Sequence, residues 1–228
     1  MEPKKAKNSG AFLALALTLV MALAWVSPAR AQEGVIKLLQ PDFTQGKTVL
    51  QALKDRKSDR VYGSGDLSLR QLSEVLWAAA GANRPLEGDK MGRTAPSGHN
   101  DQAVDTYAFT KTGVYKYDHL KHELNLVLAG DKRQAAGLQS YVATAPLNLI
   151  LVADLSKITA DTGDDLQEKI NIANTDVGHM SENVYLYSAS AGLNVICRNN
   201  IEPEALSKLL NLPEHYLPIL GVTVGLPK

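Results

Sequence analysis

Apolar residues recur at helical spacing in two early segments of the chain, near residues 47–55 and 68–80. Ser68 stands where a helix N-cap is expected, and Gly81 directly follows the last periodic residue. A serine side chain accepts a bond from the free N–H groups of a first turn, and glycine commonly ends a helix. The pattern therefore predicts two helices, the second of which begins at Ser68 and stops at Gly81.

From Thr106 the helical spacing gives way to strict alternation. The alternating residues flank a turn at residues 118–121 and are Tyr107, Phe109, Val114, Tyr115, Tyr117, Leu124, Leu126 and Leu128. A period of two residues is typical of a half-buried strand, so this region predicts strands joined by hairpins.

The second half of the chain mixes both patterns. Residues 132–142 have helical spacing, residues 148–152 form a continuous apolar run that fits a central strand, and residues 164–192 predict two helices. The last three segments predict strand, helix and strand, at residues 194–197, 202–210 and 219–224. Helices thus alternate with a mostly buried sheet, which is an α+β sandwich.

The N-terminus has the pattern of an export signal. Lys4, Lys5 and Lys7 precede an apolar run at residues 11–26, and Ala29-Arg30-Ala31 follows it as a small-x-small cleavage site. The run is short of the ~20 strongly apolar residues that a membrane span needs, although a retained anchor is the alternative. We therefore predict a signal peptide at residues 1–31, a mature domain at 32–228, and a periplasmic or secreted protein free of the membrane after cleavage.

Composition excludes several functions. The whole chain has 24 basic and 24 acidic residues, and residues 1–31 hold four basic and one acidic, which leaves 20 against 23 in the mature domain. Without a basic excess, nucleic-acid binding is not expected. The one cysteine, Cys197, cannot form an internal disulfide and is predicted to be a buried strand residue. His119 and His122 lie three apart in a predicted turn, which is not metal-ligand spacing, so no metal site is predicted.

Two segments carry candidate chemistry. Arg56-Lys57-Ser58-Asp59-Arg60 places two guanidinium groups around a hydroxyl, and such groups donate charge-assisted bonds to a phosphate. The loop Pro96-Ser97-Gly98-His99-Asn100 can lay backbone N–H groups against a ligand. An exposed charged turn and an ordinary loop are the simpler alternatives. The sequence has no hydrolase elbow, Walker loop, Rossmann glycine motif or Cys-x-x-Cys pair, so chemistry would come from a cofactor.

Taken in order, these segments resemble the nitroreductase family of FMN-dependent flavoproteins, in particular the branch of the thiazoline and oxazoline dehydrogenases. The resemblance covers the chain from about Arg56 to its end. It is carried by Arg56-x-Ser58-x-Arg60, by the Leu-Ser and Leu-Trp-Ala-Ala motifs within residues 67–81, and by the Pro96-Ser97 loop. Later segments that fit the family lie at residues 113–118, 129–131, 176–186, 190–193, 203–212 and 224–227.

The resemblance implies a three-layer α/β/α sandwich with a mostly antiparallel central sheet, and a homodimer with two FMN molecules at its interface. It assigns Arg56, Lys57, Ser58 and Arg60 to the FMN phosphate and ribityl chain. It assigns Pro96, Ser97, Gly98 and Asn100 to a loop that reaches the flavin of the other subunit. A backbone N–H in the loop Arg198, Asn199 and Asn200 would face flavin N5. Many family members have a basic tail that adds to the phosphate site; in this sequence either flavin affinity is weaker or Lys228 substitutes for that tail.

The predicted function is an FMN-dependent oxidoreductase that moves hydride through flavin N5 in alternating half-reactions with a small-molecule donor and acceptor. The acceptor would be a nitroaromatic, a quinone or an enone, and His99 would lie beside the ring. An exported, non-catalytic flavin- or ligand-binding protein that keeps the fold is the alternative. A peptide-modifying azoline dehydrogenase is a third possibility, but its added Lys-Tyr pair is not identifiable in this chain.

Overall fold

The computed structural model describes Met1 and residues 34–87, 91–161 and 163–228. From residue 34 onward these belong to one compact unit, Gln32–Lys228. The predicted signal peptide at residues 1–31 lies outside the described residues apart from Met1, so it stays a prediction. None of the described helices is both long and apolar enough to span a bilayer.

Seven strands form one sheet in which every neighbouring pair is antiparallel. Their order is β1 (Val35–Lys37), β6 (Glu123–Ala129), β5 (Gly113–Asp118), β4 (Val104–Phe109), β7 (Leu147–Asp154), β9 (Tyr216–Gly225) and β8 (Asn194–Arg198). All eight residues of β7 are buried, as the continuous apolar run predicts for a central strand. A separate hairpin joins β2 (Ala82–Pro85) to β3 (Met91–Arg93).

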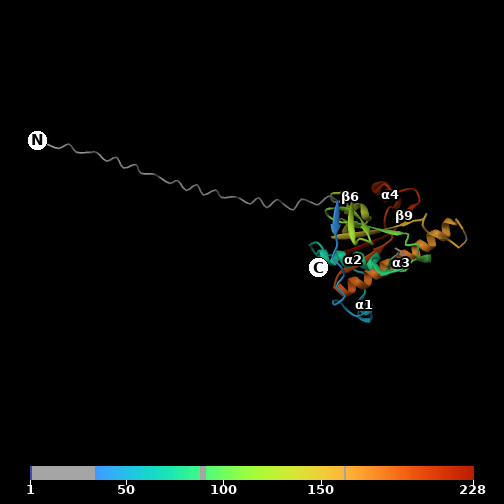
Figure 1. The fold of residues 1–228 in the computed structure, drawn as a ribbon, viewed down its shortest axis with the longest axis horizontal. Coiled ribbons are helices and arrows are strands. Elements are labelled where there is room, and N and C mark those ends of the chain that lie inside the picture. The colour runs from blue at the N-terminus through green and yellow to red at the C-terminus, as the bar shows by residue number, and fades with distance from the viewer. Residues whose placement is uncertain (2–33, 88–90, 162) are drawn as a thin grey trace. The chain divides into compact units, whose positions relative to one another are not determined.

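Helices cover both faces of the sheet, which confirms the three-layer sandwich. On one face lie α2 (Leu69–Ala80) and α3 (Leu166–Ala191), with α1 (Val49–Asp55) packed against α3. On the other lie α4 (Pro203–Leu210) and the 3₁₀ turns η2 (Arg133–Ala136) and η3 (Ser140–Ala143) (Figure 1). Successive strand residues alternate between the two cores: Ala108 joins the α2–α3 side, whereas Tyr107 and Phe109 join the α4 side.

Helix α2 begins and ends where the sequence predicts. The Ser68 side chain accepts a bond from the Gln71 N–H, and the Gln71 side chain accepts one from the Ser68 N–H over 2.9 Å, a complete capping box. Gly81 ends the helix because a side chain there would collide with the Trp77 ring.

The prediction of two helices at residues 164–192 is wrong, because α3 is one helix of 26 residues. Asp165 caps its first turn by accepting from the Gln167 and Glu168 N–H groups, and Gly192 ends it in the left-handed conformation at φ 69°. Gly178 lies in its middle, and an interior glycine costs a helix only about 1 kcal/mol relative to alanine. The buried stripe along α3 offsets that cost by packing on the sheet.

Residues 132–142 do not form the predicted helix either. They form two short turns, η2 and η3, with Gly137 in an extended conformation between them. A side chain at Gly137 would collide with the Arg198 guanidinium, so tertiary contact overrides the local helical spacing. The short strands β1, β2 and β3 have no counterpart in the sequence prediction, since three or four residues are too few to show a period.

Candidate flavin site

The basic segment 56–60 runs extended after α1, and its side chains point alternately to two sides. The Arg56 guanidinium carbon lies 5.5 Å from the centre of the Tyr185 ring, and the Ser58 hydroxyl lies 2.8 Å from the Tyr185 hydroxyl. Lys57 points the other way, where its Nζ forms an ion pair with Asp59 over 3.2 Å. The structure therefore separates Lys57 from its predicted partners Arg56 and Ser58.

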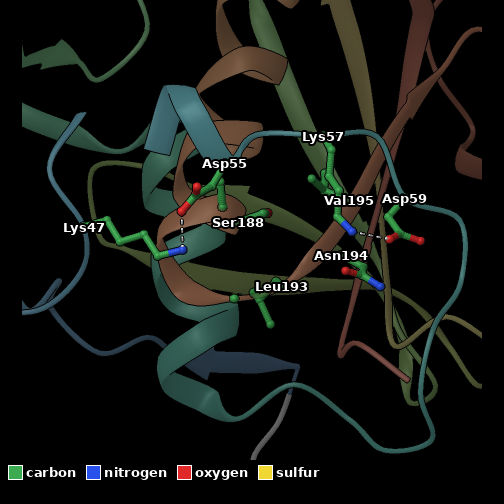
Figure 2. Close-up of a pocket in the computed structure, with 10 residues that line it drawn as sticks. Lys47, Asp55, Lys57, Asp59, Ser188, Leu193, Asn194 and Val195 are labelled. Carbon is green, nitrogen blue, oxygen red and sulfur yellow. Dashed lines mark hydrogen bonds and ion pairs between the residues drawn. The ribbon is translucent and has the colours of Figure 1, made fainter. Parts of the chain in front are cut away.

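Figure 2 shows the pocket that Lys57 lines. A second ion pair, Lys47 with Asp55 at 2.8 Å, lies across the pocket, with Asn194 and the C-terminal end of α3 nearby. Each lysine is thus paired with a carboxylate. The cavity is about 180 Å³, below the ~300 Å³ at which ligand pockets begin. This pocket is nearly neutral and too small for a flavin.

Tyr185 joins the basic segment to the end of β8. Its hydroxyl accepts a bond from the Cys197 N–H over 3.0 Å, which leaves its own proton for Ser58. The Asp59 N–H also donates to the Val195 carbonyl over 2.9 Å. The structure therefore brings Arg56 and Ser58 next to the strand that leads into residues 198–200. Tyr185 is not among the predicted site residues; the signal that could have found it is a hydroxyl on a buried helix face, which needs a partner.

Cys197 lies in β8, as predicted, and packs against the α2–α3 core. Burial raises the pKa of its thiol to about 11, so the thiol is protonated at neutral pH and is a poor nucleophile.

The predicted loop Arg198, Asn199 and Asn200 is divided in its exposure. The Arg198 side chain is buried and bonds Thr223, Asn148 and the Ala136 carbonyl. Because its guanidinium is bonded inside the chain, the Arg198 side chain is not free to bind a ligand. The prediction concerns a backbone N–H of this loop, which the burial of the side chain does not test. Asn199 and Asn200 are exposed, so a backbone donor from them to flavin N5 stays a prediction.

The second predicted segment, residues 96–100, packs against the other half of α3. The Gly98 N–H donates to Asp176 Oδ1 over 3.0 Å, and the Ser97 hydroxyl accepts from the Gln102 N–H over 3.1 Å. His99 and Asn100 have φ values of 48° and 58°, in the left-handed region that non-glycine residues rarely adopt. Pro96 and Asn100 are exposed at the surface of this strained loop.

One chain does not bring the two segments together. Asp176 and Tyr185, which anchor them, lie nine residues apart on α3, a separation of about 14 Å at 1.5 Å per residue. His99 pairs with Asp161 at 3.4 Å and lies with its loop, away from the basic segment. A ligand held by both segments of a single chain would have to span about a third of α3.

The C-terminus lies beside the basic segment. The Gly63 N–H donates to the Leu226 carbonyl over 2.9 Å, and a side chain at Gly63 would collide with the Pro227 carbonyl. Lys228 therefore lies close to Gly63, three residues after Arg60, and its role at a phosphate stays a prediction.

Histidines 119 and 122 are each engaged by a neighbour. His122 Nε2 donates to the Leu39 carbonyl over 2.9 Å, so its Nδ1 accepts from the Tyr117 hydroxyl at 2.7 Å. His119 Nδ1 accepts from Arg93 over 3.1 Å. Across the described ranges no group of three or more His, Cys, Asp or Glu side chains is arranged to hold a metal ion.

The residues around segment 56–60 fit a phosphate-bearing cofactor. Arg56 and Arg60 belong to no ion pair in the described part of the chain, in contrast to Lys57. The Ser58 hydroxyl stands between them in sequence. Two unneutralised guanidinium groups flanking a hydroxyl are a donor set suited to a phosphate monoester.

The structure is an α+β sandwich with such a cationic segment beside β8, and comparison with known proteins gives the family. The model of the Nitroreductase family matches residues 53–226. A curated Methanocaldococcus jannaschii protein named "Putative nitroreductase MJ1384" is 31% identical over 196 residues, covering 81% of this chain and 93% of that protein.

Solved structures agree. The crystal structure of a "putative nitroreductase" from Ralstonia eutropha JMP134 has a TM-score of 0.78 and 39% identity, covering 87% of this chain and 92% of that one. The NADPH:FMN oxidoreductase of Vibrio harveyi, solved with NAD⁺, has the same fold, with a TM-score of 0.57, 21% identity, and coverage of 79% and 69%. The chain belongs to the nitroreductase family and is an oxidoreductase of that family.

Proposed function

We propose that the protein is an FMN-dependent oxidoreductase that takes hydride from a small-molecule donor and passes it to an organic acceptor in alternating half-reactions. The observation that carries this proposal is the pair of unneutralised guanidinium groups, Arg56 and Arg60, on a segment that runs beside β8. The acceptor class is a nitroaromatic, a quinone or an enone. The resemblance to azoline dehydrogenases adds a second type of reaction, in which a heterocyclic substrate is oxidised by the flavin and the reduced flavin is then reoxidised.

Each part of the chain has a defined task in this proposal. Arg56, Ser58 and Arg60 hold the phosphate by charge-assisted bonds. The exposed turn Asn199–Asn200 presents backbone donors to the ring edge. The chemistry supplied by bound FMN is the transfer of two electrons and one proton, as hydride, to or from N5 of its ring. The protein binds and orients the ring and keeps one ring face open to the donor and acceptor in turn.

The 96–100 loop enters the site from a second copy of the chain. Support for a homodimer comes from α3: apart from the helix's own backbone, no atom of the described residues lies within 4 Å of a side-chain position at Gly178. Glycine inside a helix is unfavourable, so an open glycine on an exposed helix face favours close approach by another helix. Helix α1 adds apolar surface: Val49, Leu50 and Leu53 are 68%, 79% and 49% exposed.

Export is part of the same proposal and rests on the pattern of residues 1–31. It also favours a second candidate function, a non-catalytic flavin-binding protein, since a compartment outside the cytosol lacks a dependable supply of NAD(P)H.

A visible spectrum and an anaerobic titration test both candidates. The full chain, purified and incubated with FMN, is expected to be yellow, and NADH or NADPH is expected to bleach it without oxygen. A flavin that binds but resists every donor supports the non-catalytic candidate, whereas a colourless protein contradicts both. The same titration with Arg56→Ala is expected to show weaker FMN binding. Arg84→Ala is its matched control, because Arg84 is an exposed arginine outside the site.

A further inference from the structure

Arg198 is a buried cation whose three side-chain bonds all go to neutral groups. Its Nε donates to Thr223 Oγ1 over 2.9 Å, its Nη2 to Asn148 Oδ1 over 3.1 Å, and its Nη1 to the Ala136 carbonyl over 2.5 Å. The residue is 6% exposed, and no carboxylate in the described part of the chain acts on its charge. A buried charge without an opposite partner is unfavourable, so stability alone does not account for it.

The surrounding chain is shaped to admit this guanidinium. A side chain at Gly137, before η3, or at Gly221, in β9, would collide with it. Neither glycine has a left-handed backbone conformation, so conformational freedom does not explain why glycine occupies these positions. The need to leave room for the Arg198 guanidinium does explain it. The polar bonds then tie the end of β8 to β7, β9 and η2 together.

The group that these bonds hold is the exposed turn after β8. Arg198 is the last residue of the strand, and Asn199 and Asn200 follow it directly. The Leu138 N–H donates to the Asn200 carbonyl over 3.3 Å, next to the Ala136 carbonyl that Arg198 contacts. Arg198 and Asn200 are therefore both bonded to residues 136–138, and these two bonds fix the position of the turn relative to that segment.

We propose that Arg198 is a positioning residue for the flavin reaction, one that fixes the Asn199–Asn200 turn and places a positive charge behind it. This inference rests on the proposed function. When a hydride donor such as a reduced nicotinamide gives two electrons and one proton to a neutral flavin ring, the donor leaves oxidised and the ring gains one negative charge. A buried cation is weakly screened, so it stabilises the reduced ring over the oxidised one.

The test compares three variants of the full-length holoenzyme. Arg198→Gln removes the charge, Arg198→Lys keeps the charge but loses the planar fork, and Thr223→Val removes one bond partner and keeps the whole arginine. Binding of reduced relative to oxidised FMN is expected to fall roughly tenfold in Arg198→Gln, which is about 30 mV in midpoint potential for a two-electron couple. Arg198→Lys and Thr223→Val are expected to stay near the wild-type potential.

Hydrogen exchange of residues 199–201, measured without flavin, tests the positioning separately. Exchange is expected to be faster in Arg198→Gln and Arg198→Lys than in the wild type. An unchanged potential in Arg198→Gln, or an equal shift in Thr223→Val, overturns the electrostatic role. Unchanged exchange at residues 199–201 in both Arg198 variants overturns the positioning role. This measurement needs no flavin, so it tests the positioning role even if the protein binds none. Failure to bind flavin would instead overturn the proposed function. Where Arg198→Gln does not fold, faster exchange in Arg198→Lys still tests the positioning role. A potential far from the wild type in Arg198→Lys, which keeps the charge, would contradict the electrostatic role.

Discussion

The two segments that flank α3 differ in what they offer a ligand. Segment 56–60, near Tyr185, is extended and has the unpaired cations Arg56 and Arg60. Loop 96–100 has a strained backbone and is hydrogen-bonded to Asp176 of α3. The first has charge for an anion, and the second has fixed backbone and amide groups for a ring. About a third of α3 separates them, and this separation is the reason for the proposal that a complete site takes one segment from each of two chains.

The largest expected effect comes from the exposed face of α3. Gly178→Leu places a bulky side chain where two copies of the helix are proposed to meet. Overpacking costs about 1–3 kcal/mol in each of the two copies. The dissociation constant of the dimer is therefore expected to rise at least ~30-fold, and bound flavin is expected to be lost with the dimer. Analytical ultracentrifugation measures the dimer. Gly178→Ala is the control, since alanine is small and favours the helix. A Gly178→Leu protein that stays dimeric and yellow contradicts the proposed interface.

Next in size is the contrast within the basic segment. Arg56→Ala and Arg60→Ala each remove a charge-assisted bond of about 1.5–3 kcal/mol, which predicts FMN binding that is ~10- to 100-fold weaker. Lys57→Ala is expected to change affinity less than ~3-fold, because an exposed ion pair contributes little and Lys57 already pairs with Asp59 on the other side. Titration calorimetry with FMN measures all three. Equal losses for the lysine and the arginines would remove the distinction between the two sides.

A smaller effect is expected at the link between the segment and β8. Tyr185→Phe leaves the Cys197 N–H without its acceptor, and an unsatisfied buried donor destabilises a fold by about 1–3 kcal/mol. Urea denaturation is expected to show this loss in the free energy of unfolding. Tyr115→Phe removes a hydroxyl that bonds the exposed Thr112; it is the control and is expected to change little, because Thr112 can bond water instead. A Tyr185→Phe protein of wild-type stability would show that the bond does not hold the segment in place.

The smallest expected effect is a pH dependence of stability at His119, which belongs to neither segment. Burial, followed by the nearby Arg93 charge, lowers the pKa of His119 to about 4 from its ordinary 6.5. The unfolded chain therefore binds this proton first, and stability is complete above pH 6.5 and falls as the pH drops toward 4. His119→Asn is expected to flatten that part of the curve in thermal denaturation between pH 4 and 7. A variant with an unchanged slope contradicts this assignment.

The sequence could predict the elements whose signal is local. The Ser68 cap, the alternation around Phe109 and the buried run of β7 needed no knowledge of distant contacts, and all three are confirmed. The family could also be read from short motifs in order. The single long α3 could not, because its interior Gly178 resembles a helix stop until the packing on either side is known.

The candidate site shows the same limit more sharply. The residue types of Arg56, Lys57 and Ser58 suggest one phosphate cluster, but an extended backbone turns Lys57 to the opposite side. Arg198 looks like a surface residue in sequence. Its burial depends on Gly137 and Gly221, which are distant along the chain and meet the guanidinium only in the folded sheet.

Mixing two defective chains tests the shared site most directly. One chain has Arg56→Ala with Arg60→Ala, and the other has Ser97→Gly with Asn100→Gly, which keeps the positive φ of the loop. Each alone is expected to bind little FMN. After unfolding and refolding together, random pairing in a two-fold dimer predicts that about one quarter of all sites combine two intact segments and bind FMN. A mixture that binds no more FMN than its separate parts would contradict a site built from two chains.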